Sequence, residues 1–178
     1  TTTNFIKLRS SSSGSRWYLK STGSASIYAV DVKDCAASAN TLNASASTDS
    51  GNNVNWTFGT TRTWIGPGNW SVASNWSPAG VPGMNDSAIF NNANNCTVDI
   101  STTVAALNLQ AAYTGTLTVG QPLTLTGGYI EAGGALSLGT SVLTIGSSLL
   151  LTGGAFNAGT GTVVFNAPPV RSRLLPMV

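Results

Sequence analysis

The chain contains no histidine among its 178 residues, and only 8% of its residues are charged. A globular protein usually carries about 25% charged residues, so surface polarity here has to come from serine, threonine, asparagine and glycine. Without histidine, the commonest general base and the usual zinc ligand are missing, as is any serine–histidine or cysteine–histidine nucleophile pair. The composition therefore favours a scaffold or a binding surface over a catalyst.

The few charges are balanced along most of the chain. Residues 1–170 hold six acidic and six basic side chains, and Arg171 and Arg173 follow in the last eight residues. A neutral body offers no electrostatic footprint for nucleic acid or an anionic membrane face. No apolar run approaches the roughly 18 residues needed to span a bilayer, and the first residues do not resemble a leader segment. We therefore expect no nucleic-acid partner and no membrane insertion, and we interpret the chain as an excised or processed piece.

Cysteine is also scarce, with only Cys35 and Cys96 present. The two lie far apart and form no CxxC pair, and small secreted domains that depend on disulfides usually carry four or more cysteines. One bridge remains possible, but unpaired cysteine is among the most buried residue types, so we expect two buried free thiols. A charge-poor chain rich in serine, threonine and asparagine indicates an extracellular or cell-surface location.

The clearest pattern that is present is a 26-residue repeat. Residues 117–133 are followed by a second version of themselves at 143–159, with Leu117 matching Leu143 and the pair Gly127-Gly128 matching Gly153-Gly154. A fixed period of this length is typical of a solenoid, in which each unit buries its apolar face against its neighbours. Short apolar runs between turns also suit an ordinary β-sandwich, but a sandwich gives no reason for successive hairpins to resemble each other. The repeat therefore predicts an all-β chain wound as a parallel β-helix, with coils of about 24–26 residues.

A fainter version of the same period occurs in the first third of the chain. Ile6 and Leu8 recur as Val30 and Val32 and again as Trp56 and Phe58, and Trp17 recurs as Leu42. We predict closing coils of a first segment over 1–59, a tryptophan- and proline-rich linker or cap over 60–87, a second segment over 88–166, and an irregular tail over 167–178. Proline cannot donate to a strand ladder, which excludes 60–87 from central sheet.

Alternation along each strand predicts which side chains face the interior. Leucine, valine and isoleucine should point inward and form ladders, while the threonines between them face solvent. Paired glycines should mark corners where a positive φ is needed. The predicted inward residues are Leu117, Val119, Leu123, Leu125, Leu136, Leu138, Leu143, Ile145, Leu149 and Leu151.

The central segment contains a series of short motifs: Trp64-Ile65-Gly66, Asn69-Trp70, Asn75-Trp76, Val81-Pro82-Gly83, Asp86-Ser87-Ala88, Asn95-Cys96-Thr97-Val98-Asp99 and the run from Ala111 to Leu117. With these motifs it resembles the start of β-helical repeat modules found in very large bacterial secreted and surface proteins, including autotransporter-like ones. Segments of residues 8–58 look like the closing coils of a preceding module. The resemblance implies a right-handed parallel β-helix, export, and a role in adhesion or surface coating. It also implies that Cys96 belongs to the module pattern.

Aromatic side chains provide the first candidate site. Trp64, Trp70, Trp76 and Tyr113 could form a platform on which sugar rings stack, with neighbouring asparagines supplying hydrogen bonds. The alternative is that the same rings plug the end of the solenoid, because tryptophan buries a large apolar area. A carbohydrate-binding module and a cap are thus both open at this stage.

The acidic residues provide weaker candidates. A polysaccharide hydrolase needs two carboxyl groups flanking one bond, and a lyase on this fold would pair bound calcium with a basic residue such as Arg9 near Asp31. The run 49–53 has the oxygen density of a calcium loop, with Asp49 and Asn52 as ligands, but it lacks the acidic repetition of an EF-hand. We expect solvated turn charges, no catalytic residues, and no cofactor unless calcium binds. The predicted function is a structural or adhesive segment of an exported bacterial surface or filament-forming protein, with glycans or copies of itself as partners.

Overall fold

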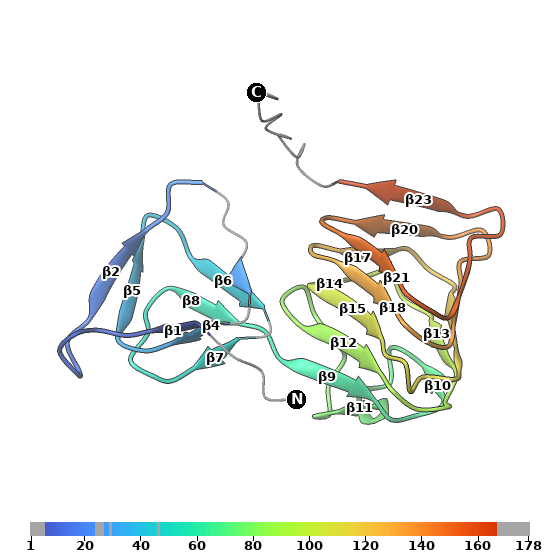
Figure 1. Ribbon diagram of the computed structural model, residues 1–178, viewed down its shortest axis with the longest axis horizontal. Helices are drawn as coiled ribbons and strands as arrows, with labels where there is room; N and C mark the ends of the chain where they lie inside the picture. Colours follow the sequence, from blue (N-terminus) through green and yellow to red (C-terminus); the bar gives the residue numbers. More distant parts are fainter. Residues whose placement is uncertain (1–5, 24–26, 29, 46, 167–178) are drawn as a thin grey trace, which may run out of the picture.

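The computed structural model describes residues 6–23, 27–28, 30–45 and 47–166. Almost all regular structure in these residues is β-strand, and the strands pair in parallel with the corresponding strands of the next coil. The chain is therefore a β-solenoid, as the sequence predicted (Figure 1). Its strands form two stacks of coils, with β1–β8 in one and β9–β23 in the other, and no sheet of the described residues contains strands from both. The predicted tail lies outside the described residues.

The first stack has three coils. Its first and second coils have three strands each, and in the third coil the bridge from Val54 to Ala36 takes the place of a middle strand. The three sheets are β1-β4-β7, β2-β5 and β3-β6-β8. The strands are β1 (Ile6–Leu8), β2 (Trp17–Lys20), β3 (Ile27–Tyr28), β4 (Val30–Val32), β5 (Cys35–Ser38), β6 (Leu42–Ser45), β7 (Thr48–Asp49) and β8 (Trp56–Phe58).

The second stack begins with an irregular coil and continues with four regular ones. The irregular coil contains β9 (Thr61–Trp64), β10 (Gly68–Asn69), the short 3-10 helix η1 (Ala73–Asn75) and β11 (Trp76–Ser77), which runs antiparallel to β9. Apart from β11, the strands of the second stack pair in parallel in three sheets, which are β9-β12-β15-β18-β21, β10-β13-β16-β19-β22 and β14-β17-β20-β23. The regular strands are β12 (Ser87–Phe90), β13 (Cys96–Val98), β14 (Thr102–Val104), β15 (Ala106–Leu109), β16 (Thr116–Val119), β17 (Leu123–Leu125), β18 (Tyr129–Glu131), β19 (Ala135–Ser137), β20 (Val142–Ile145), β21 (Leu149–Leu151), β22 (Ala155–Asn157) and β23 (Thr162–Phe165).

The coils of the second stack are shorter than predicted. Leu117 stacks on Leu136, and Leu123 stacks on Leu143. One coil therefore takes up about 20 residues, which is the lower end of the range for repeats of this kind. The expected step from Leu117 to Leu143 is wrong, because it joins β16 of one sheet to β20 of another. The strands of all three sheets alternate inward and outward residues in the same way. Aligning the sequence with itself at an offset of one coil plus one strand therefore matches apolar residues nearly as well as an offset of one coil.

In the first stack the outcome is mixed. Ile6 pairs with Val30 and Leu8 with Val32, as the sequence offset predicted. Trp17, however, pairs with Cys35, and Trp56 pairs with Leu42. The strand β5 (Cys-Ala-Ala-Ser) has none of the large β-branched residues that mark a strand, so the sequence pattern matches Trp17 to Leu42 instead of to Cys35.

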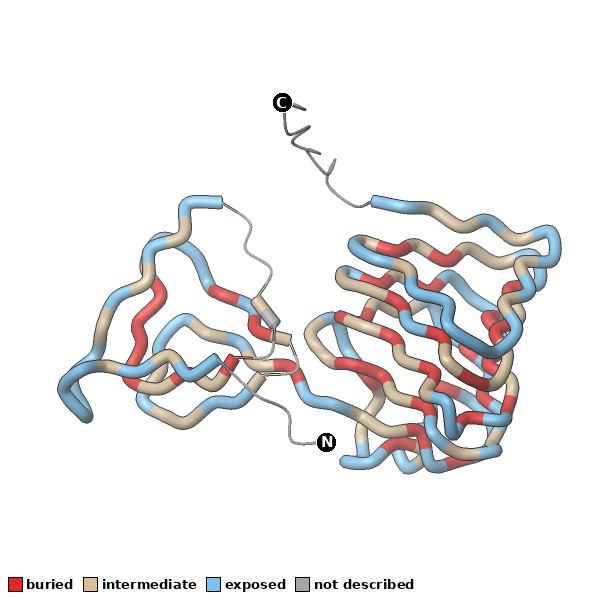
Figure 2. The backbone as a smooth tube through the Cα atoms, in the orientation of Figure 1, coloured by how far each residue is buried: buried red, intermediate tan, exposed pale blue. Residues whose placement is uncertain are grey.

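The inward register of the second stack is confirmed. Eight of the ten predicted inward residues are buried, from Leu117 to Ile145, while Thr118 between two of them is exposed. Leu149 and Leu151 continue the ladders, but they belong to the last described coil, and Leu151 is 47% exposed. Figure 2 shows buried positions recurring along successive coils of the second stack, alternating with less buried ones. Each fully buried leucine or isoleucine contributes roughly 1.5–3 kcal/mol.

The paired glycines are required mainly by close approach between coils. A Cβ atom on Gly127 would lie 2.6 Å from the carbonyl oxygen of Ala105 in the preceding coil, and Gly127 has no positive φ. Gly154 does have a positive φ of 78°. The prediction of left-handed corners thus holds for Gly154, whereas Gly127 is needed because the neighbouring backbone leaves no room for a side chain.

The connection between the two stacks is hydrogen-bonded on both sides. The backbone N–H of Gly59 donates to the carbonyl of Ala44 in the first stack, and the N–H of Thr60 donates to the carboxylate of Asp86 in the second.

No helix in the described ranges is long and apolar enough to cross a membrane.

Candidate functional site

The three tryptophans of residues 60–87 form one aromatic cluster around Phe90. Trp76 lies edge-on to both Trp64 and Trp70, with ring centroids 5.0 and 4.6 Å apart. Phe90 contacts all three indoles and also Tyr113, whose ring centroid is 5.3 Å away. Such edge-to-face arrangements stabilise aromatic pairs by about 0.5–1.5 kcal/mol beyond the area they bury.

Trp64 and Trp76 belong to β9 and β11, which lie at the lower end of the second stack in Figure 1. Trp64, Trp70, Trp76 and Tyr113 are each no more than 1% exposed. The indole N–H of Trp76 donates to the carbonyl of Trp70, and the Tyr113 hydroxyl donates to the carbonyl of Asn94. A sugar ring can stack only on an aromatic face that solvent reaches, so these four residues do not form the glycan platform proposed above. These four residues instead form the apolar cap at the end of the solenoid, the alternative given in the sequence analysis.

Two carboxylates tie the coils of the first stack together. Asp31 accepts hydrogen bonds from the guanidinium of Arg9 and from the hydroxyl of Ser50, which lie in the coils on either side, and the Arg9 bond is also an ion pair. Asp34 accepts from the side-chain amide of Asn52 at 2.7 Å and from the backbone of Gly14 at 3.1 Å. The bond from Arg9 holds the pKa of Asp31 below its ordinary value, and the bond from Asn52 does the same for the pKa of Asp34.

Asp86 and Asp99 have equivalent roles in the cap of the second stack. Asp86 accepts from the backbone of Thr60 and Gly83 and forms an ion pair with Arg62 at 3.0 Å. Burial pushes the pKa of Asp86 up, but these bonds outweigh it and the net shift is downward. Asp99 accepts from both the backbone and the hydroxyl of Ser71, and the hydroxyl bond lowers its pKa.

Glu131 is the one carboxyl group inside the apolar core. It is fully buried on β18, and the hydroxyl of Tyr129 donates to it at 2.7 Å. Burial raises the pKa of Glu131, because a charged carboxylate is costly in an apolar environment. Glu131 stacks between Leu109 and Leu151 in its ladder. Among the described residues the side-chain hydrogen-bond partner of Glu131 is this hydroxyl, and not a second carboxyl group of the kind that a glycosidase pairs with its acid.

The calcium candidates Asp49 and Asn52 bond to different partners. Asp49 accepts from the backbone of Gly51 and the side chain of Asn53, which closes an Asx turn within its own loop. Asn52 instead donates to Asp34 and to the carbonyl of Gly14 in the earlier coils. The described residues contain no group of three or more acidic or cysteine side chains that could hold a metal ion. The loop is thus explained by its turn and by the coils it joins.

The prediction of two buried free thiols is confirmed. Cys35 and Cys96 are unpaired and at most 1% exposed. Burial raises the pKa of both thiols, so neither has the thiolate character that a nucleophile needs. Cys96 occupies an inward ladder position, where it stacks on Leu117.

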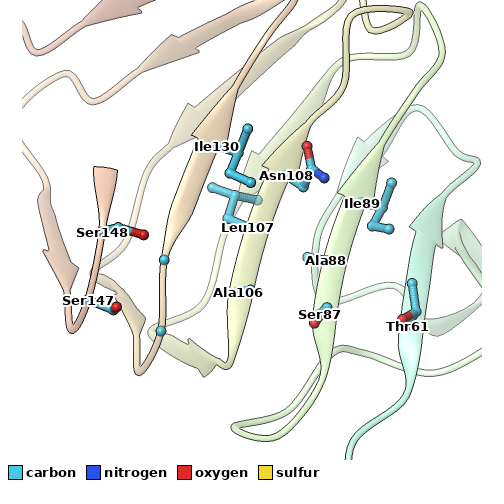
Figure 3. Close-up of a pocket in the computed structure, with 12 residues that line it drawn as sticks. Thr61, Ser87, Ala88, Ile89, Ala106, Leu107, Asn108, Ile130, Ser147 and Ser148 are labelled. Atoms are coloured by element: carbon cyan, nitrogen blue, oxygen red, sulfur yellow. The ribbon is translucent and has the colours of Figure 1, made fainter. Parts of the chain in front are cut away.

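A trough that the sequence reasoning missed lies on the outer face of the sheet formed by β9, β12, β15, β18 and β21 (Figure 3). Its volume is about 370 Å³, and none of its 12 lining residues is charged. Two outward ladders cross it. One is a track of small residues, and the other carries two isoleucines and an asparagine. The ladders are Thr61, Ser87, Ala106, Gly128 and Ser148, and Thr63, Ile89, Asn108, Ile130 and Leu150.

Ser87 stands out among these residues because it is only 7% exposed and its hydroxyl has no hydrogen-bond partner. The outward alternation of β9, β12 and β15 could have been predicted from the sequence. The trough could not, because its shape depends on Gly127 and Gly128 lying beside Ala106, and that requires the correct coil length.

Comparisons with protein-family models, with curated proteins and with solved structures found no match to this chain. The resemblance to bacterial surface modules therefore stays a prediction.

Proposed function

We propose that this chain is a non-catalytic structural segment of an exported bacterial surface protein, a rigid solenoid that supports adhesion. The observation that carries the proposal is that the carboxylates are hydrogen-bonded within the chain. All six acidic side chains of the sequence accept hydrogen bonds from groups of the chain itself: Asp31, Asp34, Asp49, Asp86, Asp99 and Glu131. The five aspartates are bonded to neighbouring coils, turns and the cap, and Glu131 accepts from Tyr129 of its own strand inside the core, where no substrate reaches it.

The construction of the second stack supports a mechanical role. Twenty buried residues form one continuous apolar cluster from the tryptophan cap to Ile145. Parallel ladders bond each coil to the next along its length, so bending would have to break several backbone bonds together. Export is supported by the low charge and the polar uncharged surface, which match the bacterial modules that the sequence resembles.

Product assays and surface labelling test this proposal. Purified protein incubated with pectin, xylan and alginate should release no reducing ends and no unsaturated products. An antibody against residues 60–166 should label intact cells of the source bacterium as strongly as broken ones. Product formation above a heat-denatured control would overturn the non-catalytic assignment, and labelling confined to broken cells would overturn export.

Copies of the same chain are the partner that the end of the second stack supports. The last described coil leaves its strand edges and part of its apolar ladders uncovered, with Leu151 47% and Phe165 56% exposed. At the other end of the chain, β1, β2 and β3 are the outer strands of their sheets among the described residues. The strand edges of the last coil of one copy can pair in parallel with those of the first coil of the next copy. Repeated head-to-tail pairing of this kind extends into a filament.

Sedimentation tests that contact. The assembly size should increase with protein concentration, and Leu151→Lys should abolish the increase, while the matched change Thr118→Lys on an exposed lateral position should not. A monomer at all concentrations would remove self-assembly from the proposal and leave the rigid segment in place.

A further inference from the structure

We propose that the trough across β9, β12, β15, β18 and β21 binds an uncharged polysaccharide. This inference rests on the proposed adhesive function and names the ligand class and the residues that would serve it. It replaces the buried tryptophans with a different surface, on the opposite side of the sheet from the core. The trough runs across successive strands, so an extended chain lying in it would follow the axis of the coils.

The unpaired hydroxyl of Ser87 is the observation that points to a ligand. Leaving a buried polar group without a partner costs about 1–3 kcal/mol. Five other buried side-chain nitrogen or oxygen atoms of the described residues also lack a partner, but Ser87 is the one of the six that lines the trough, where a ligand could supply the bond. Ser87 lies on the outward face of β12, between Thr61 and Ala106 in the small-residue ladder, and it lines the trough. Asn108 lies in the second ladder, beside Ile89, and its side chain also points outward into the trough (Figure 3).

The lining as a whole selects the class of ligand. Because no charged residue lines the trough, it offers nothing to recognise a phosphate, a uronate or an acidic peptide. Ile89 and Ile130 supply aliphatic walls over a floor of Ala106 and glycine, while serine, threonine and asparagine supply neutral donors and acceptors. A neutral sugar chain presents the complementary surface, since it has apolar C–H faces and hydroxyl groups at its edges.

Peptide binding is less well served by this surface. The recurrent way for a sheet to bind an extended peptide is to add it as a strand at a free edge. Here the floor is the face of a sheet whose central strands β12, β15 and β18 are each paired on both sides, so their backbone groups are already used. Recognition has to come from side chains alone, which favours a ligand rich in hydroxyls.

A binding assay tests the proposal by comparing the wild-type chain with variants in which a larger side chain fills the trough or a polar side chain is removed from it. The full chain is mixed with microcrystalline cellulose, with chitin, with soluble neutral β-glucan and with polygalacturonate, and the bound fraction is measured. The variant Ala106→Tyr places a ring in the trough from an outward position. Its control, Thr118→Tyr, adds the same ring to the exposed face of β16 in the same coil. Asn108→Ala removes one polar partner without adding bulk and serves as the second variant.

We expect wild type and Thr118→Tyr to bind at least one neutral glycan equally, with no binding to polygalacturonate. Ala106→Tyr should weaken binding by about tenfold or more, which corresponds to about 1.4 kcal/mol, and Asn108→Ala should weaken it less. Thermal melting of each variant establishes that it is folded, and Asn108→Ala decides the test if Ala106→Tyr is not.

The proposal would be overturned if wild type bound no neutral glycan, or if it preferred the charged polymer. It would also be overturned if Ala106→Tyr bound as well as wild type, or, should Ala106→Tyr not fold, if Asn108→Ala did. The fourth contrary result is a loss of self-association in Ala106→Tyr. The last would make the trough a contact between copies. None of these results would show catalysis or intracellular location, so the structural function is tested separately.

Discussion

The two stacks reach the same coiled architecture by different means. The first has a core of four buried residues with six partly buried hydrophobic residues packed against it, and polar side chains such as Arg9, Asp31 and Asn52 bond its coils to one another. The second has a core of twenty buried side chains in aliphatic and aromatic ladders. Stacked parallel strands thus define the fold, and the buried core inside them can be small or large.

The largest effect should come from breaking an apolar ladder of the second stack. Leu125→Asp places a charge at a fully buried position between Val104 and Ile145, and we expect the second stack not to fold. Thr124→Lys, one residue away and facing outward, should change the melting temperature little. Circular dichroism melts of the two variants check this, and similar tolerance of both would contradict the assigned register.

Removing one ring of the cap should have the next largest effect. Trp76 is packed against Trp64, Trp70 and Phe90, and Trp76→Ala should destabilise the second stack by about 3–5 kcal/mol through loss of buried area and the cavity that remains. Urea denaturation gives the number. A loss below about 1 kcal/mol would show that the cluster is not a core, and would reopen Trp76 as a surface residue.

Acid should separate the two stacks. The pKa values of Asp31 and Asp34 are lowered in the folded chain, so the stability they give is complete above the ordinary value of 3.8 and is lost as pH falls below it. Acid also removes the bonds of Asp86 and Asp99 in the cap of the second stack. The first stack has the smaller buried core, so its amide protons should exchange faster near pH 3 while those of 117–145 stay protected. Hydrogen exchange by mass spectrometry measures this, and equal loss of protection in both stacks would contradict the comparison.

The smallest expected effect concerns Glu131, whose pKa is shifted in the opposite direction. A raised folded pKa means that ionisation above the ordinary value of 4.5 weakens the fold, so Glu131→Gln should raise the melting temperature at pH 7. The gain should shrink as pH falls toward 4.5, since the native carboxyl is then protonated as well. A gain that is independent of pH would mean that packing and not charge is responsible.

The sequence predicted the class of fold and the inward faces because alternation is a local property of each strand. Leu117, Val119, Leu123 and Leu125 could be placed inward without knowledge of their partners. Coil length could not be predicted in the same way. Strands such as Tyr129–Glu131 and Cys35–Ser38 lack the usual apolar pattern, and overlooking them made each coil look longer than it is.

The site was harder to predict than the fold. Tryptophan is equally suited to stack on sugars and to fill a core, and only packing against Phe90 decides between the two. The trough consists of serine, alanine, glycine and isoleucine, which carry no recognisable motif. It becomes visible only when β9, β12, β15 and β18 are placed side by side in the correct register.

Cross-linking across neighbouring coils tests that register most directly. Thr118 and Ser137 are paired on adjacent strands and Thr118 faces outward, so the double variant Thr118→Cys/Ser137→Cys should close a disulfide on mild oxidation, because paired strands hold Cα atoms within the range a disulfide needs. Thr118→Cys/Thr144→Cys, which follows the spacing of the sequence repeat, should keep both thiols free to alkylation, as Thr144 pairs with Thr124 and Val164 on a different sheet. Intact-mass measurement after alkylation distinguishes the two. Bridging of the second pair but not the first would contradict a solenoid in which β19 follows β16 in the next coil.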